Sequence, residues 1–300
     1  MTVQLQVAYS KSIIGSGVVA GGPYYCAANN PFFFEEICRG QNPLVPLVPS
    51  LMVDAAKRFA RDSRIDPLIN LRKRHVYVFS GIGDTVVKQR AVDATASFFQ
   101  KIGVEKGNLM YVHDVPAGHA LITSAFGNDC PVNDTPYISH CLVKNVGYDQ
   151  AGEILKHIYG PLNPPAPAPT GQIVVFNQRA FADEFTGMAE DAFLYVPPGC
   201  TATGTHCKVH VALHGCLQAA ESIGDKFYTD SGYNNWADSN NILVLYPQVN
   251  ISGFLPHPLS PYNPGGCWDW LGYTGPNYAT KKSSQMTAIM AMVNRLTQAR

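Results

Sequence analysis

The stretch "HVYVFSGIGD", residues 75–84, has the composition of a buried strand that ends at a glycine and precedes a carboxylate. A short run rich in valine and aromatic residues and bounded by glycine is typical of a strand in a parallel sheet. In open α/β sheets, ligands bind beyond the carboxyl ends of such strands. The pattern therefore places Asp84 where a functional side chain of an α/β protein is expected.

Strand-like and helix-like segments alternate on both sides of this stretch. Strands are predicted at residues 13–20, 109–115, 172–178, 191–200, 208–216 and 241–248, with 172–178 and 191–200 as an antiparallel pair. Helices are predicted at 51–59, 91–101, 148–158, 233–240 and 284–298, and the apolar opening of the chain reads like the middle of another. The alternation indicates an α/β fold, with a mostly parallel sheet covered by helices on both faces.

The segment "GPLNPPAPAPTG", residues 160–171, carries five prolines in twelve residues, which makes a stiff and extended connector. A chain of 300 residues can form one large α/β domain or two small ones. Neither side of the connector has a self-sufficient set of strands. We therefore expect one domain over residues 1–300, with the connector running over its surface.

Composition excludes several classes of partner. The chain has 22 basic and 22 acidic residues without long runs of either sign, so no charged surface for nucleic acid or an anionic membrane is expected. No apolar stretch reaches the roughly 18 residues that a membrane span needs. No zinc-type spacing of cysteine and histidine occurs, and we expect neither a metal nor a cofactor.

The eight cysteines include three pairs whose spacing is that of local loops. These pairs are Cys26–Cys38, Cys130–Cys141 and Cys200–Cys207. One interpretation is a full set of disulfides formed in an oxidising compartment, and the alternative is eight separate buried thiols. The chain opens without the basic and apolar regions of a signal peptide, although an oxidised protein should have been exported.

A histidine follows the strand predicted at 109–115. His119 lies in "DVPAGHALIT", residues 114–123. A carboxylate and then a histidine, each after its own strand, is the order of the second and third members of an α/β-hydrolase triad. The alternatives are an aspartate that only caps a turn or helix, and a histidine that is purely structural.

The stretch "VALHGCLQ", residues 211–218, is a strand that ends in His-Gly. α/β-Hydrolases build one wall of the oxyanion hole in this way, because the glycine lets a following backbone N–H point at the developing oxyanion. In this chain the N–H of Cys216 would have that position. The alternative is an ordinary glycine turn after a strand.

Six motifs together resemble the poly(3-hydroxybutyrate) depolymerase family of esterases. They are "AGGPYYCA" (20–27), "GIGDTVV" (81–87), "AGHALIT" (117–123), "LHGCLQ" (213–218), "YPQ" (246–248) and "GGCWDW" (265–270). The resemblance covers essentially the whole chain. In most of the family LHGC precedes the acid and the histidine, whereas here it follows them, as in the single-domain, circularly permuted extracellular form known from a fungus.

The resemblance implies a circularly permuted α/β-hydrolase whose amino-terminal half starts at about residue 172. It implies a secreted or periplasmic, monomeric serine esterase that hydrolyses poly(3-hydroxybutyrate) or related esters through an acyl-enzyme. Asp84 would be the triad acid, His119 the general base and the Cys216 N–H an oxyanion donor. His214, Gly215 and Trp268 would contact the substrate, and Cys216–Cys267 would be the fourth disulfide.

The family's nucleophile motif, G-L-S-[SA]-G-G, is not found. In the family it immediately precedes a helix that leads to "VAYS" and "AGGPY", and here that helix begins at Met1. We therefore expect the central nucleophile strand and the signal peptide to be missing through truncation, and this chain to be inactive. Neither Ser16, inside a predicted strand, nor Ser124, without flanking glycines, fits the sharp turn that a nucleophile needs.

Two other functions stay open from the sequence. The same mechanism could act on short soluble or feruloyl-type esters, since cleft width and loop shape decide between polymer and small substrate. A third reading is a non-catalytic, polymer-binding relative that kept the scaffold.

Overall fold

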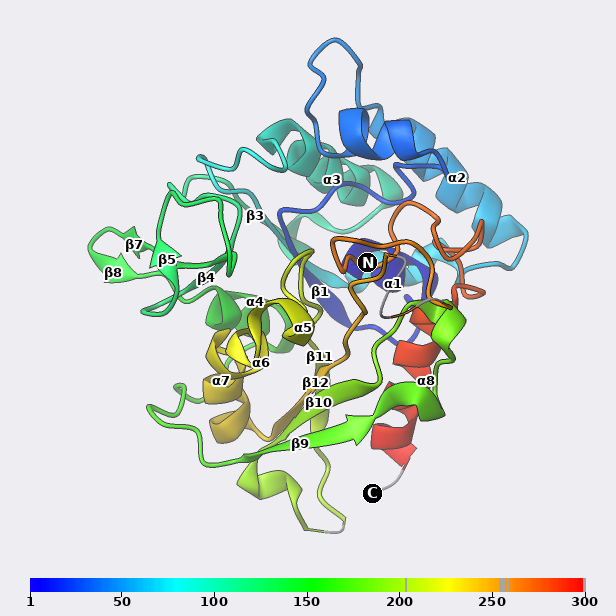
Figure 1. The fold of residues 1–300 in the computed structure, drawn as a ribbon. Coiled ribbons are helices and arrows are strands. Elements are labelled where there is room, and N and C mark those ends of the chain that lie inside the picture. The colour runs from blue at the N-terminus through cyan, green and yellow to red at the C-terminus, as the bar shows by residue number, and fades with distance from the viewer. Residues whose placement is uncertain (203, 254–256, 258, 299–300) are drawn as a thin grey trace. The chain divides into compact units, whose positions relative to one another are not determined.

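The computed structural model describes residues 1–202, 204–253, 257 and 259–298. The chain divides into two compact units (Figure 1). Unit 1 comprises Met1–Tyr148 and Asp269–Ser283, and unit 2 comprises Asp149–Trp268 and Ser284–Arg300.

The main sheet of unit 1 is three-stranded and parallel, in the order β1-β2-β3. Its strands are β1 (Gly15–Val19), β2 (His75–Phe79) and β3 (Leu109–Val112). Because β2 is the central strand, its residues from Val76 to Phe79 are completely buried. The strands predicted around these three segments, including the one at residues 75–81, are confirmed.

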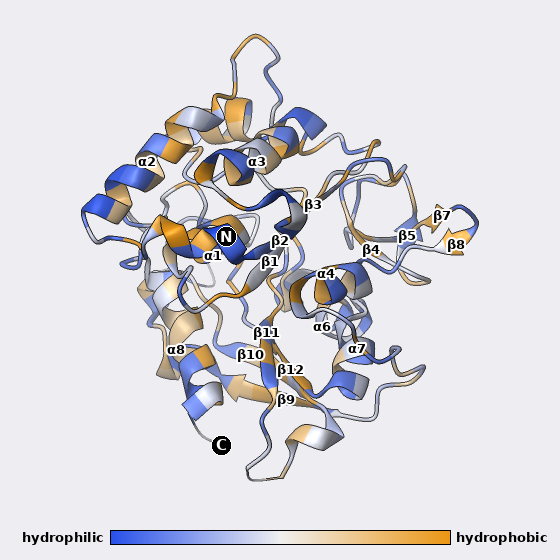
Figure 2. Cartoon of the chain, turned by 180° about the vertical axis from the view of Figure 1, so that it is seen from behind, coloured by the Kyte–Doolittle hydropathy of each residue, from blue (hydrophilic) through white to orange (hydrophobic). Residues whose placement is uncertain are grey.

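Three α-helices belong to unit 1: α1 (Thr2–Ala8), α2 (Pro49–Arg61) and α3 (Gln89–Ile102). α1 contacts β1, whereas α3 contacts β2 and β3 and lies beside α2 (Figure 1). Both longer helices are amphipathic, and α3 buries Val92, Phe98 and Phe99 before it ends at Gly103, whose φ of 106° suits glycine. Figure 2 shows hydrophobic and hydrophilic residues alternating along α2. The chain opens in a helix, as predicted.

Unit 1 also contains short elements that the sequence did not reveal. A small sheet has the order β4-β6-β5, and a separate hairpin pairs β7 with β8. The short elements are β4 (Leu121–Thr123), β5 (Asn128–Asp129), β6 (Ile138–His140), β7 (Leu142–Val143), β8 (Val146–Gly147), the π-helix η1 (Phe33–Cys38) and the 3₁₀ turns η2 (Leu68–Lys73) and η3 (Lys106–Asn108). Strands of two or three residues are too short to show a hydrophobic period.

The sheet of unit 2 has the order β11-β12-β10-β9. Its strands are β9 (Gln172–Asn177), β10 (Asp191–Val196), β11 (Lys208–Val211) and β12 (Ile242–Tyr246). β11 and β12 are parallel, whereas β10 is antiparallel to both of its neighbours, which confirms the predicted antiparallel pair. The strand predicted to reach Cys200 ends earlier, because Pro198–Cys200 forms a 3₁₀ turn.

The helices of unit 2 are α4 (Gln150–Tyr159), α5 (Ala220–Ile223), α6 (Lys226–Asp230), α7 (Tyr233–Asn240) and α8 (Ser284–Gln298), with 3₁₀ turns η4 (Gln178–Ala180), η5 (Glu184–Thr186) and η6 (Pro198–Cys200). Asp149 caps α4 by accepting a hydrogen bond from the Gly152 N–H at 2.9 Å. The same carboxylate accepts a hydrogen bond from the indole of Trp236, which ties α4 to α7.

The proline-rich connector, residues 160–171, lies along α7 within unit 2. Asn235 exchanges two hydrogen bonds with the backbone of Ala166. Asp238 accepts hydrogen bonds from the backbone N–H groups of Thr170 and Gly171. The connector therefore does not separate the two units, whose boundaries lie at Tyr148/Asp149, Trp268/Asp269 and Ser283/Ser284.

All eight cysteines form disulfides, and no free thiol remains. Unit 1 contains Cys26–Cys38 and Cys130–Cys141, and unit 2 contains Cys200–Cys207 and Cys216–Cys267. The four predicted pairs are confirmed. Within the described ranges, no helix is long and apolar enough to cross a bilayer.

Candidate active site

Asp84 and His119 meet in unit 1 although 35 positions separate them in the sequence. Oδ2 of Asp84 lies 2.9 Å from Nδ1 of His119. The carboxylate is completely buried, whereas a quarter of the imidazole side chain is exposed. A buried acid that supports a partly exposed imidazole is the arrangement in which His can exchange a proton with a substrate.

The backbone around Asp84 fixes the direction of its carboxylate. Asp84 follows β2 in a tight turn, and its Oδ1 accepts hydrogen bonds from the N–H groups of Val86 at 2.9 Å and Val87 at 2.8 Å. These two bonds occupy one oxygen and direct the other toward His119. Asp84 therefore has the turn-forming role that was given above as an alternative, and it has a second one. Its carboxylate both holds the turn and contacts the imidazole of His119.

Two loops run side by side at this point. The loop after β2 donates hydrogen bonds from Ile82 to the Val115 carbonyl and from Gly83 to the Ala117 carbonyl, at 2.9 and 2.8 Å. Gly81 permits the approach, because a Cβ at that position would lie 2.3 Å from the Ala117 oxygen. The predicted meeting of the two strand ends is thus built from direct hydrogen bonds between the loops.

Asn133 is a further residue at this position, and no sequence motif predicted it. Its side chain hydrogen-bonds to the backbone of both loops. Asn133 lies in a polar loop between short strands and belongs to none of the recognised motifs. Its proximity to Cys130, whose local disulfide was predicted, was the only signal in the sequence.

The outer side of the imidazole faces Tyr137, with ring centroids 5.8 Å apart and the rings nearly perpendicular. Among the described residues, no serine hydroxyl hydrogen-bonds to His119. Ser16 is buried in β1, and its hydroxyl has no hydrogen-bond partner in the described part of the chain. Ser124 is exposed after β4.

The other candidates, His214, Gly215, Cys216 and Trp268, lie together in unit 2. Gly215 and Cys216 are exposed where the chain leaves β11. The Gly215 N–H donates to Oε1 of Gln218 at 2.7 Å, and the Leu217 N–H donates to the Gly265 carbonyl at 2.7 Å. Between them, the Cys216 N–H makes no hydrogen bond to any residue that the structure describes. An exposed and unused N–H in a fixed turn is available to a ligand oxygen.

His214 is buried, with 2% of its surface exposed. Nδ1 donates to the Gly215 carbonyl at 2.7 Å, and Nε2 accepts a hydrogen bond from the Val249 N–H at 3.4 Å. Burial lowers the pKa of His214 to about 4, against a smaller opposing effect of the hydrogen bond to Gly215. Both ring nitrogens are therefore hydrogen-bonded to backbone groups, one in this turn and one at Val249, which follows β12.

Trp268 follows Cys267, which is bonded to Cys216. Its ring centroid lies 5.4 Å from that of His214, and only 4% of its surface is exposed. The indole Nε1 is buried without a hydrogen-bond partner among the described residues. Trp268 thus presents little of its ring to solvent.

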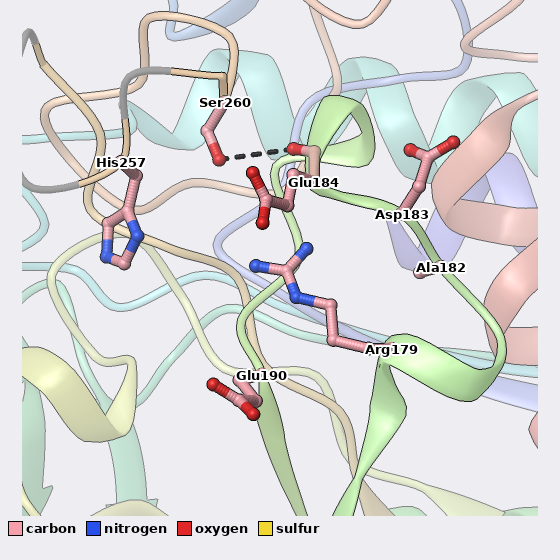
Figure 3. A pocket seen from close by; sticks show the side chains of 7 residues that line it. All are labelled: Arg179, Ala182, Asp183, Glu184, Glu190, His257 and Ser260. Atoms are coloured by element: carbon pink, nitrogen blue, oxygen red, sulfur yellow. Dashed lines mark hydrogen bonds between the residues drawn. The ribbon is translucent and has the colours of Figure 1, made fainter.

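A polar pocket of about 570 Å³ lies elsewhere in unit 2 (Figure 3). Its lining is Arg179, Ala182, Asp183, Glu184, Glu190, His257 and Ser260. The Ser260 hydroxyl donates to the Glu184 carbonyl at 3.2 Å (Figure 3). None of the residues predicted for the site lines this pocket. In the described ranges, no three His, Cys, Asp or Glu residues are grouped to bind a metal ion.

Comparison with known proteins identifies the family. A poly(3-hydroxybutyrate) depolymerase of Delftia acidovorans is 41% identical over 300 residues, which are 99% of this chain and 57% of that protein. A polyhydroxybutyrate depolymerase of Talaromyces funiculosus is 36% identical over 306 residues, covering 99% of this chain and 86% of that protein. The chain belongs to the polyhydroxybutyrate (PHB) depolymerase family. No protein-family profile matches it.

Solved structures of PHB depolymerases have the same fold. A serine-to-alanine variant in complex with an R3HB trimer superposes with a TM-score of 0.85 at 34% identity, covering 99% of this chain and 91% of the other. The enzyme from Penicillium funiculosum gives a TM-score of 0.84 at 34% identity with the same coverage. The predicted α/β-hydrolase-like fold is confirmed. The chain spans just over half the length of the Delftia PHB depolymerase.

Proposed function

We propose that this chain carries the acid and base of a serine esterase that hydrolyses the ester bonds of polyhydroxybutyrate or related hydroxyalkanoates. The observation that carries the proposal is the 2.9 Å contact between the buried Asp84 carboxylate and the partly exposed His119 imidazole. The substrate class follows from the PHB depolymerase relatives.

His119 acts as the general base. The Asp84 carboxylate accepts a hydrogen bond from the Nδ1–H of His119, so the lone pair of the neutral imidazole is on Nε2. Nε2 takes the proton of a serine hydroxyl as the serine oxygen forms a bond to the ester carbonyl carbon. The imidazolium then gives that proton to the departing alkoxide. Water repeats the two steps on the acyl-enzyme and releases the acid and the free serine.

The Cys216 N–H stabilises the negative oxygen of each tetrahedral intermediate. This role is supported by the exposure of Cys216 and by its N–H, which has no other acceptor in the described chain. A second donor is the N–H of the residue after the nucleophile. Loss of one such donor costs about 10²–10³ in kcat. Gly215, which is exposed beside Cys216, would border the substrate, and Trp268 would do so only through the small part of its ring that is exposed.

The nucleophile is not assigned to any serine of these 300 residues, because none stands in G-L-S-x-G-G. We therefore expect the 300 residues alone to lack esterase activity. The motif order, with LHGC after Asp84 and His119, supports a circular permutation of a single catalytic domain. The four disulfides support export to an oxidising compartment.

The test compares this chain with a version extended before Met1 by a strand and G-L-S-S-G-G. The extended chain should hydrolyse a short 3-hydroxybutyrate ester, and its Ser→Ala counterpart should fold without hydrolysing it. The 300-residue chain itself should show no hydrolysis above background. Enzymatic turnover by the unextended chain that survives His119→Ala would overturn the assignment of the site.

A further inference from the structure

The Asn133 side chain uses its full hydrogen-bonding capacity on backbone groups. Its Oδ1 accepts from the N–H groups of Thr85 at 3.0 Å and His119 at 2.8 Å. Its Nδ2 donates to the carbonyls of Gly83 at 3.0 Å and Pro131 at 3.1 Å. Backbone N–H groups only donate and carbonyls only accept, so these four partners fix which end of the amide is oxygen.

The partners of Asn133 surround the Asp84–His119 pair. Gly83 and Thr85 are the residues on either side of Asp84, and the third partner is the backbone of His119 itself. One side chain therefore connects the loop of the acid to the loop of the base. We propose that Asn133 is the positioning residue that sets the Asp84–His119 distance, an inference that rests on the proposed roles of these two residues.

The loop that carries Asn133 is itself anchored. Cys130 at its start is bonded to Cys141, and the Cys130 carbonyl accepts the N–H of Gly118, next to His119. Nδ2 of Asn128 donates to the carbonyls of Asp134 and Thr135, at 3.0 and 3.1 Å. Asn133 is thus presented to the two catalytic loops by a cross-linked loop rather than by a free one.

Asn133 acts through geometry and not through contact with substrate. Without its amide, the N–H groups of Thr85 and His119 lose their shared acceptor, and each loop can move separately. A displacement of about 1 Å in a catalytic constellation can lower the rate about 10²-fold. The expected result is a disturbed His119 Nδ1 hydrogen bond in a chain that still folds.

The experiment uses the 300-residue chain with ¹⁵N-labelled histidine and follows the His119 Nδ1 proton by NMR at neutral pH. In the unsubstituted chain this proton should be hydrogen-bonded, shifted downfield and absent in Asp84→Asn, which assigns it. In Asn133→Ala this resonance should be lost, or its proton should exchange with solvent at least tenfold faster. Asn133→Asp, which keeps the shared acceptor, should retain more of it and provides the test if Asn133→Ala does not fold.

Asn128→Ala is the matched control, because the Asn128 side chain also donates twice to backbone within the cross-linked loop, and neither of these bonds goes to the loop of Asp84 or of His119. Asn128→Ala should keep the NMR resonance of the His119 Nδ1 proton. An unchanged resonance in both Asn133 variants, or equal loss in Asn128→Ala, would overturn the proposal for Asn133 alone. If the unsubstituted chain lacks the hydrogen-bonded proton, the proposed acid–base pair fails as well.

Discussion

Gly118 brings the loop of His119 against the loop of Asn133. A Cβ at Gly118 would lie 2.3 Å from the Val132 carbonyl oxygen and 2.7 Å from that of Pro131. Both obstacles are backbone, so Gly118→Ala should lower the free energy of unfolding by about 1–3 kcal/mol. Urea titration measures this loss. The NMR resonance of the His119 Nδ1 proton should weaken at the same time.

Gly107→Ala is the control for that substitution. A Cβ at Gly107 meets no atom within 4 Å, so the free energy of unfolding should change by less than about 0.5 kcal/mol. Equal stability of the Gly118→Ala and Gly107→Ala chains would show that the close approach at Gly118 is not what fixes this loop.

His214 should make the protein less stable as the pH falls. Its pKa is lowered by burial from 6.5 to about 4, so between these values the unfolded chain binds a proton that the folded chain does not. The free energy of unfolding should therefore fall by roughly 1.4 kcal/mol for each pH unit below 6.5. His214→Asn keeps a donor for the Gly215 carbonyl but does not titrate, so it should lack this component.

The measurement is urea unfolding of both chains at pH 7, 6 and 5. The difference in free energy of unfolding between the parent and His214→Asn should shrink by about 2 kcal/mol from pH 7 to pH 5. A pH-independent difference for His214→Asn would mean that His214 is not held neutral by its surroundings.

At the residue scale, sequence reasoning finds side chains that follow recognisable strands. Asp84 and His119 were predictable because each comes after a strand and parallel strands end at one edge of the sheet. Asn133 was not, because its four partners are backbone groups, which every sequence supplies. His214 was expected to contact substrate, and its two backbone hydrogen bonds depend on the fold, which brings Val249 to it from 35 positions away.

At the element scale, the Cys130–Cys141 disulfide should support the site as well as the fold. Replacing both cysteines by serine should lower the free energy of unfolding by about 2–4 kcal/mol, because the cross-link no longer restricts the unfolded chain. The NMR resonance of the His119 Nδ1 proton should weaken too. The reason is that the Cys130 carbonyl accepts the N–H of Gly118, the residue before His119, at 2.8 Å.

The matched control replaces Cys200 and Cys207, which close another local loop, with a separation of 7 positions against 11, in unit 2. That double variant should have a lower free energy of unfolding than the parent, and it should keep the NMR resonance of the His119 Nδ1 proton. Equal effects of the two double variants on the histidine resonance would rule out a specific link between the Cys130–Cys141 loop and the Asp84–His119 pair.

Helices of several turns and strands with a continuous run of buried residues could be predicted from the sequence, whereas strands of two or three residues could not. α7 and α8 have the predicted bounds, because the sequence there keeps a helical period. β4 to β8 have two or three residues each, and their pairing depends on partners that the local sequence does not specify. The connector was recognised from its prolines, but its attachment to α7 depends on side chains about 70 positions away.

For the whole molecule, the disulfides and the fold were predicted mainly from the cysteine spacing and from the six sequence motifs. Three disulfides join cysteines 7 to 12 positions apart, and local spacing suggested them. Cys216–Cys267 spans 51 positions, and only the family resemblance suggested it. The division into two units was not foreseen, because three separate crossings of the chain between the units leave no mark in composition.

The central claim is that Asp84 and His119 are the acid and base of a PHB-hydrolysing serine esterase. The most direct measurement is the initial rate at which soluble 3-hydroxybutyrate products leave amorphous PHB, using the chain extended by the nucleophile elbow. We predict that His119→Ala lowers this rate by about 10⁴-fold or more while the protein still folds and binds the polymer. A rate within tenfold of the unsubstituted enzyme would contradict the claim.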